Sequence, residues 1–300
     1  MVLPSPHRVS TPRREKHMKE STSNMPTWLI TGCSTGLGRH LAQAVLERGW
    51  NAVVTARNPS TVRDIAAPYP NTALALALDV TDRTQVAEAV RQAEARFGTV
   101  DVLVNNAGHG YRAAVEEADE DDVDELFATN FFGPVALIKA VLPGMRARRS
   151  GTIVNVSSIA GRFAPPGSGY YSATKFALEG MSDALRKEVG PLGIKVIVVE
   201  PGAFRTDFAG RSLQQSLTAI ADYGDTAGQR RKDNDTSHGH QQGDPARGAQ
   251  VVIRAVEAPD APFRLLLGRD AIQVMRTELD AQRTELDKWE ETSVTTDFPV

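Results

Sequence analysis

Short apolar segments alternate with longer stretches of helical periodicity along most of the 300-residue chain. The short segments are rich in β-branched residues and apolar throughout, which is typical of parallel strands buried on both faces. The longer stretches place apolar residues three and four positions apart, as in helices with one buried face. The predicted strands are 28–31, 52–55, 73–78, 100–104, 152–156, 194–199 and 263–267, and the predicted helices are 39–48, 59–67, 82–97, 119–148, 172–189, 245–257 and 271–289.

This alternation predicts a single α/β domain, a Rossmann-type doubly wound parallel sheet of about seven strands. We assign residues 25–293 to it. Residues 1–24 are rich in Pro, Ser, Thr, Arg and Lys without periodicity, and we expect a disordered arm. Residues 205–243 interrupt the alternation with a polar run, which predicts a mobile loop near the substrate.

Composition and charge narrow the possible functions. The net charge of −3 provides no basic field for nucleic acid or an anionic membrane, so neither is an expected partner. No apolar run is evident at the roughly 20 residues of a membrane span, and residues 1–24 lack the apolar core of a secretory signal. The single cysteine, Cys33, excludes an internal disulfide and fits a reducing, cytoplasmic location. His238 and His240 alone do not predict a metal site.

A glycine-rich turn follows the first predicted strand. Residues 31–38 read Thr-Gly-Cys-Ser-Thr-Gly-Leu-Gly and lead into the helix over 39–48. A backbone without Cβ atoms can approach a diphosphate closely, and a helix start offers free N–H donors and partial positive charge. The spacing differs from the common G-x-G-x-x-G pattern, so the turn alone is also compatible with a flexible strand-to-helix connection.

Polar residues follow the later strands, where ligands of open parallel sheets bind. Arg57 stands after the second strand, where NAD enzymes usually carry an acidic residue, and its guanidinium suits the 2′-phosphate of NADP. The third strand is followed by Asp79 and Val80, and the fourth by Asn-Asn-Ala-Gly over 105–108. The pattern therefore favours NADP(H) over NAD(H), although Arg57 could also be a plain surface arginine.

Tyr171 and Lys175 lie four residues apart at the start of a predicted helix and therefore share one face. A nearby ammonium and a cationic nicotinamide would lower the pKa of the phenol, and the hydroxyl of Ser157 or Ser158 could bind a substrate carbonyl. These groups would suffice for carbonyl reduction.

With these motifs together, the chain resembles the short-chain dehydrogenase/reductase family over about residues 26–291, and within it NADP-preferring bacterial hydroxysteroid and retinol dehydrogenase-like enzymes. The resemblance implies that Tyr171 is the acid/base, Lys175 holds the ribose, Ser158 orients the substrate and Asn130 anchors a relay water. Thr35 stands where some NADP enzymes carry a basic residue, which leaves Arg57 to bind the phosphate. The implied cofactor contacts are Thr31, Gly32, Ser34, Thr35, Gly36, Leu37, Gly38, Arg57, Asp79, Val80, Asn106, Ala107, Gly108, Tyr171, Lys175, Pro201, Gly202 and Thr206.

We therefore expect hydride transfer between NADP(H) and a carbonyl or secondary alcohol of a small-molecule substrate. Residues 109–115, 159–169 and 204–223 would form the pocket, which Phe163, Phe204 and Phe208 would make apolar. The resemblance also implies a homodimer or homotetramer formed through the helices at 119–148 and 172–189. The alternatives are a non-catalytic NADP(H) sensor and a sugar-nucleotide epimerase or dehydratase. The four catalytic residues speak against the first, and the glycine spacing and the lack of a larger C-terminal domain against the second.

Overall fold

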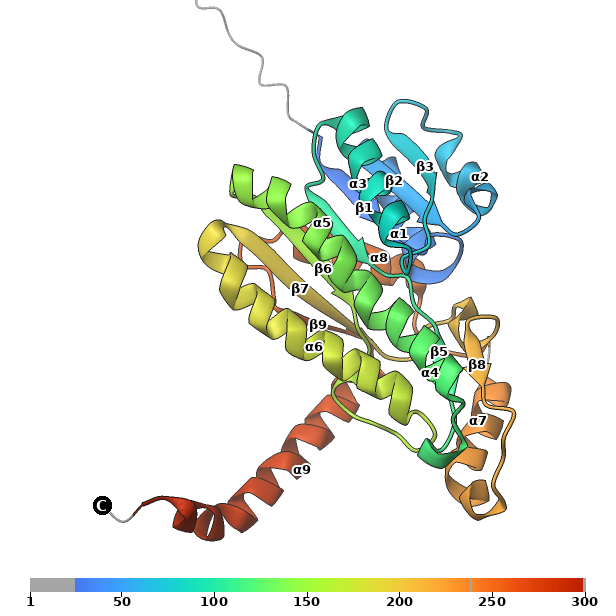
Figure 1. The fold of residues 1–300 in the computed structure, drawn as a ribbon, viewed down its shortest axis with the longest axis vertical. Helices are drawn as coiled ribbons and strands as arrows, with labels where there is room; N and C mark the ends of the chain where they lie inside the picture. The colour runs from blue at the N-terminus through green and yellow to red at the C-terminus, as the bar shows by residue number, and fades with distance from the viewer. Residues whose placement is uncertain (1–24, 238, 299–300) are drawn as a thin grey trace, which may run out of the picture.

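A sheet of seven parallel strands forms the centre of the protein (Figure 1). The computed structural model describes residues 25–237 and 239–298, so the predicted arm over 1–24 lies outside the described residues. The strand order is β3-β2-β1-β4-β6-β7-β9, which confirms the doubly wound prediction. The strands are β1 (Thr27–Ile30), β2 (Asn51–Ala56), β3 (Ala73–Ala77), β4 (Val102–Asn105), β6 (Gly151–Val156), β7 (Ile194–Pro201) and β9 (Arg264–Leu267).

Helices cover both faces of the sheet, because successive strand residues point to opposite sides. Trp28 and Ile30 of β1 belong to one apolar core with α1 (Gly36–Glu47) and α8 (Pro245–Glu257). Leu29, between them, belongs to the other core, with helices α3 (Arg83–Phe97), α5 (Gly133–Arg148) and α6 (Gly169–Val189). The continuous apolar strands predicted from the sequence are thus explained by burial on both sides.

The predicted helix over 119–148 consists of three parts. Helix α4 (Glu120–Phe127) is followed by a π-helical turn (Ala128–Phe132) and then by α5, with Pro143 inside α5. By length and composition alone this 29-residue run could cross a membrane, contrary to the prediction from the sequence. Its apolar window is 44% buried within the protein, where α5 packs against the sheet core. Packing in the fold therefore accounts for much of its apolar character.

The segment over 205–243 is more structured than the sequence predicts. Strand β8 (Leu213–Gln215) pairs in parallel with β5 (Gly110–Arg112), and α7 (Gln229–Ser237) follows. Glu117 connects this segment to the rest of the domain. Its carboxylate accepts a hydrogen bond from Ile220 N at 2.8 Å and forms an ion pair with Arg231 at 2.6 Å. These partners lie about a hundred residues away, so periodicity could not reveal them.

Two helices complete the described chain. The short α2 (Arg63–Ala66) follows a 3-10 turn after β2. Helix α9 (Arg269–Ser293) extends the predicted 271–289 at both ends and projects away from the body in Figure 1. Among its residues only Ala271 and Met275, in the first two turns, are buried.

Candidate active site

Hydrogen bonds join the glycine turn after β1 to the loop after β4. The hydroxyl of Thr31 accepts bonds from the backbone N–H groups of Asn106 and Ala107, both at 2.9 Å. In return, Asn106 Nδ2 donates to the carbonyl oxygens of Thr31 at 2.8 Å and Gly32 at 3.1 Å. The two loops border the place where the strand order reverses, which is the ligand crevice of doubly wound sheets.

Glycine is required where these loops meet. Gly32 has a φ of +69°, and a Cβ there would lie 2.9 Å from the Cα atom of Ala107. A Cβ on Gly38 would collide with the side-chain amide of Asn106 and with the carbonyl oxygen of Gly32. Any larger residue would separate the turn from the loop.

The start of α1 has the properties of a diphosphate site. Thr35 at its N-cap makes no side-chain hydrogen bond to the helix, and no acidic residue stands in the first turn. Thr206 lies beside the turn, because a Cβ on Gly36 would be 3.3 Å from its Cβ atom. Free N–H donors, the helix dipole and an approach without side chains suit the diphosphate of a dinucleotide. Residues 31–38 therefore fit the implied cofactor.

The predicted adenosine contacts lie at the same edge of the sheet. Arg57 is exposed and directly follows β2. Asp79 follows β3 closely, and its carboxylate accepts bonds from the N–H and hydroxyl groups of Thr81 at 2.9 and 2.7 Å. Val80 is buried, and a Cβ on Gly133 would touch its side chain at 2.8 Å. Asp79 is thus fixed by its hydrogen bonds to Thr81, and Val80 by its close packing against Gly133.

The structure brings Tyr171, Lys175 and Ser158 together at the ends of β6 and α6. The Lys175 Nζ atom lies 5.8 Å from the centre of the Tyr171 ring and donates to the carbonyl oxygen of Val156 at 2.9 Å. Ser158 is hydrogen-bonded to the Tyr171 side chain and also accepts a bond from Ala160 N at 3.0 Å. The neighbouring Tyr170 instead donates to the Val115 carbonyl at 3.3 Å. This geometry agrees with choosing Tyr171 over Tyr170.

Burial governs the ionisation of this group. Burial raises the pKa of Tyr171, although the hydrogen bond from Ser158 and the charge of Arg112 oppose the rise. The lowering of this pKa that we predict requires the nicotinamide cation as well as Lys175, so it stays a prediction for the protein with cofactor bound. Burial also lowers the pKa of Lys175 to about 8, and the Glu179 carboxylate partly counteracts it. A lysine with a pKa near neutrality is sensitive to any charge placed beside it.

Asn130 connects the loop after β4 to α6. Within the π-helical turn, its Nδ2 donates to the His109 carbonyl at 2.9 Å and to Thr174 Oγ1 at 3.3 Å, while its Oδ1 accepts from His109 N at 3.0 Å. A Cβ on Gly108 would lie 2.9 Å from Asn130 Oδ1 and 3.7 Å from Lys175 Nζ. Asn130 therefore stands beside Lys175 with its amide bonded to the protein.

His109 borders the same space. Its imidazole is partly buried, and burial lowers its pKa, while the charges of Glu125 and Asp122 oppose the shift and those of Arg57 and Lys175 add to it. Both Arg57 and Lys175 thus direct their charge toward the crevice between the loops.

The two phenylalanines of the 204–223 segment have different environments. The Phe208 ring lies 5.6 Å from the Tyr171 ring, as expected for a pocket wall. Phe204 instead packs with the core beside α1 and α8, so its predicted place in the pocket is wrong. Pro201 ends β7, and the Gly202 N–H donates to the Leu267 carbonyl at 2.9 Å. The predicted nicotinamide contact segment thus begins at a fixed strand end.

Three residues that support or border this site were not predicted, because they lie outside the sequence motifs. Asp270 accepts a hydrogen bond from Ala203 N at 2.6 Å and packs against Gly202, which steadies the segment after β7. Thr174 supports Asn130, as described above. Arg112 is a buried arginine beside Tyr171, and its only sequence signal is its place in the otherwise uncharged stretch over 108–115.

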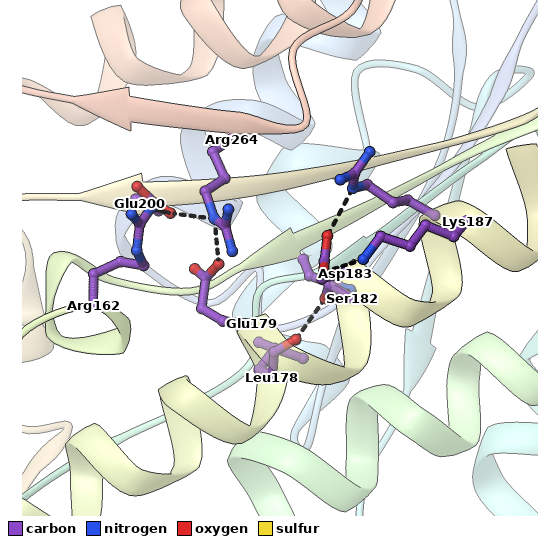
Figure 2. A network of polar contacts seen from close by, with 10 residues as sticks. Arg162, Leu178, Glu179, Ser182, Asp183, Lys187, Glu200 and Arg264 are labelled. Atoms are coloured by element: carbon purple, nitrogen blue, oxygen red, sulfur yellow. Dashed lines mark hydrogen bonds and ion pairs between the residues drawn. The ribbon is translucent and has the colours of Figure 1, made fainter. Parts of the chain in front are cut away.

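A cluster of four charged residues lies one helical turn beyond Lys175 (Figure 2). Arg264 Nε is 3.0 Å from Glu179 Oε2 and 3.4 Å from Glu200 Oε1, and Arg162 Nη1 is 3.2 Å from the same Glu200 oxygen. Burial and the charge of Glu179 raise the pKa of Glu200 to about 7, against the attraction of the two arginines. Because Glu179 also acts on Lys175, this cluster is electrically connected to the catalytic group.

No group of three or more His, Cys, Asp and Glu side chains that could hold a metal ion occurs within 25–237 and 239–298.

Comparisons with known proteins agree with this geometry. The sequence profile of the short chain dehydrogenase family matches residues 26–216. Oxidoreductase BOA17 of Botryotinia fuckeliana is 38% identical over 268 residues, which are 89% of this chain and 97% of that protein. The crystal structure of a short-chain dehydrogenase from Streptomyces avermitilis has a TM-score of 0.85 and 42% identity, and covers 91% of this chain and 100% of its own.

An alcohol dehydrogenase from the archaeon Thermococcus sibiricus, solved in complex with 5-hydroxy-NADP, has a TM-score of 0.66 and 25% identity. The match covers 81% of this chain and 96% of that one. The chain belongs to the short-chain dehydrogenase/reductase family. It is therefore an NAD(P)-dependent oxidoreductase that acts on a small-molecule substrate.

The Glu200 cluster makes stability depend on pH. A carboxyl whose pKa rises on folding binds a proton more tightly in the folded state, so the free energy of unfolding falls as pH rises from about 4.5 to about 7. We expect Glu200→Gln to remove this dependence. The melting temperature of the wild type should fall relative to that of Glu200→Gln by about 3–6 °C between pH 5 and pH 8.

Thermal unfolding followed by circular dichroism measures this difference. Glu285→Gln, on the exposed part of α9, is the matched control and should track the wild type at every pH. A constant difference between the wild type and Glu200→Gln would show that the arginines keep Glu200 ionised throughout.

Proposed function

We propose that the protein reduces a carbonyl group, or oxidises the corresponding secondary alcohol, with NADP(H) as the hydride carrier. The observation that carries this proposal is that the Ser158 hydroxyl, the buried Tyr171 phenol and the buried Lys175 ammonium come together at the ligand crevice. A hydride acceptor bound there would find a hydrogen-bond donor, a proton donor and a positive charge within a single space.

Each residue then has a physical role. NADPH, when bound, supplies the hydride that reaches the carbonyl carbon. Ser158 donates a hydrogen bond to the carbonyl oxygen, and Tyr171 transfers its phenolic proton to that oxygen as the alcohol forms. Lys175 stabilises the phenolate left behind, because its positive charge lies against the Tyr171 ring. Asn130 holds residues 106–109 in place beside Lys175. Solvent restores the proton to Tyr171 before the next cycle.

The cofactor residues would divide the nucleotide among them. Residues 31–38 and Thr206 would hold the diphosphate at the start of α1. Asp79 and Val80 would border the adenine, residues 106–108 would lie along the ribose next to it, and Pro201 and Gly202 would face the nicotinamide. The contacts between Gly36 and Thr206 and between Gly108 and Asn130 support this division, because both glycines leave a surface free of side chains.

Replacing Tyr171 tests the reaction. Tyr171→Phe removes the proton donor and leaves the ring in its apolar surroundings, so we expect turnover to fall by about 100- to 10,000-fold. Nucleotide binding should remain close to that of the wild type. NADPH consumption with a panel of aldehydes, ketones, quinones and steroid ketones measures turnover, and fluorescence titration of NADPH measures nucleotide binding.

Tyr170→Phe is the matched control, because Tyr170 donates its hydroxyl to Val115 on the other side of the helix start. Near wild-type turnover in Tyr171→Phe would overturn the assignment. NADPH binding without turnover, in this panel and with alcohols plus NADP, would favour the non-catalytic sensor.

The preference for NADP(H) is supported by Arg57. The carboxyl end of β2 carries no acidic residue, since Thr55, Ala56 and Arg57 stand there. Arg57 is exposed, and its charge reaches as far as His109 in the crevice. A guanidinium in this place would pair with a 2′-phosphate and gain nothing from a 2′-hydroxyl.

A charge-removing substitution measures that preference. We expect Arg57→Ala to raise the KM for NADPH by about 10-fold, the lower end for a charge-assisted hydrogen bond at an exposed site, and to leave the KM for NADH nearly unchanged. Arg63→Ala, another exposed arginine close in sequence, is the control. An equal effect on both cofactors would contradict a phosphate contact.

We also propose that two copies associate through α4, α5 and α6, which lie side by side on one face of the molecule in Figure 1. Phe132, in the π-helical turn between α4 and α5, and Phe176 on α6 are 49% and 46% exposed, although large apolar side chains are usually buried. We expect light scattering to report a dimer or tetramer for the wild type and a smaller species for Phe176→Glu. Leu286→Glu on α9 is the control, and an unchanged mass of Phe176→Glu would contradict this interface.

A further inference from the structure

Arg112 has no role in the chemistry proposed above, yet it lies buried close to Tyr171. The residue ends β5 and is only 8% exposed. A buried guanidinium is costly unless an anion or several acceptors compensate it. The partners of Arg112 therefore decide what this residue does.

The protein itself supplies little compensation. Arg112 Nη1 donates to the backbone carbonyl of Tyr111 at 3.2 Å, and its Nε atom is buried without an acceptor. Among the residues that the structure describes, none of the ion pairs involves Arg112, and the charge of Arg230 opposes its own. Burial lowers the pKa of Arg112 to about 10, which leaves it charged at neutral pH. By contrast, Arg231, which lies next to Arg230 in the segment over 205–243, pairs with the buried Glu117 at 2.6 Å.

Neighbouring contacts relate Arg112 to the aromatic rings of Phe208 and Tyr171. A Cβ on Gly110, two residues earlier, would lie 3.3 Å from the Phe208 ring, and that ring lies 5.6 Å from the Tyr171 ring. The backbone carbonyl of Arg112 accepts a hydrogen bond from Ser216 N at 3.0 Å. This bond ties β5 to the segment over 205–243. Because residues two apart in a strand point to the same side, the Arg112 side chain leaves β5 on the side of Phe208 and Tyr171.

We propose that Arg112 binds an anionic group of the substrate, and that this substrate is a ketone or secondary alcohol that carries a carboxylate. The inference rests on the proposed function and adds the substrate class to it. The free Nε–H and a terminal amino group of a guanidinium bind the two oxygens of a carboxylate side by side. Phe208 and the Tyr171 ring contact the apolar body of such a compound, while the carboxylate neutralises the buried charge.

Paired ketones of equal size test this assignment. 4-Acetylbenzoate carries a carboxylate where 4-isopropylacetophenone carries an uncharged group with the same number of non-hydrogen atoms. We measure kcat/KM for both with the wild type, Arg112→Met and Arg91→Met. We expect the wild type to favour the carboxylate by about 10- to 100-fold, the range of a charge-assisted hydrogen bond. Arg112→Met should lower this ratio to about one. Arg91→Met should keep it, because Arg91 is exposed on α3, outside the pocket segments, and paired with Glu88 at 2.6 Å.

A binding measurement separates this inference from the proposed reaction. Calorimetric titration of the full-length protein with benzoate and with phenyl phosphate requires no turnover, and we expect benzoate to bind the wild type and not Arg112→Met. Benzoate binding without ketone reduction would contradict the proposed reaction and still support the anion site. Equal ratios in the wild type and Arg112→Met, or tighter binding of phenyl phosphate than of benzoate, would overturn the carboxylate assignment. Should Arg112→Met fail to fold, a wild-type ratio near one without benzoate binding would overturn it equally.

Discussion

The site depends on the close approach of the backbone after β4 to the glycine turn after β1. Thr31 accepts two backbone N–H groups from the loop over 105–108, and Asn106 returns two hydrogen bonds to the turn. On its other side, Asn130 binds both backbone groups of His109. The loop is thereby held between two neighbours, and its glycine leaves a flat surface next to Lys175.

Burial organises the electrostatics around this loop. Lys175 and Glu200 both have pKa values displaced toward neutrality by burial, and Glu179 acts on each of them. The positive charges of Arg162 and Arg264 offset the repulsion between the carboxylates of Glu179 and Glu200 (Figure 2). A change of charge anywhere in this chain of groups therefore reaches Lys175.

The substrate side is built differently from the nucleotide side. Residues 31–38 bind through backbone groups, so their geometry follows directly from a short sequence motif. On the substrate side, β5 pairs with β8 although the two strands are a hundred residues apart, and Glu117 anchors the segment that follows β8. We expected an apolar pocket, and the contact between Phe208 and Tyr171 fits that expectation, whereas the anion site proposed at the buried Arg112 would add a positive charge.

Local patterns determined the fold and the chemical motifs of this protein, because hydrophobic periodicity and motif spacing act over few residues. Continuous apolar strands required a sheet buried on both faces, and the spacing of Tyr171 and Lys175 required a shared helix face. Only the tertiary structure decided that Phe204 packs in the core, that Asn130 sits in a π-helical turn, and that burial raises the pKa of Tyr171. Those outcomes depend on neighbours distant in the chain and on the desolvation of charge, which no local pattern records.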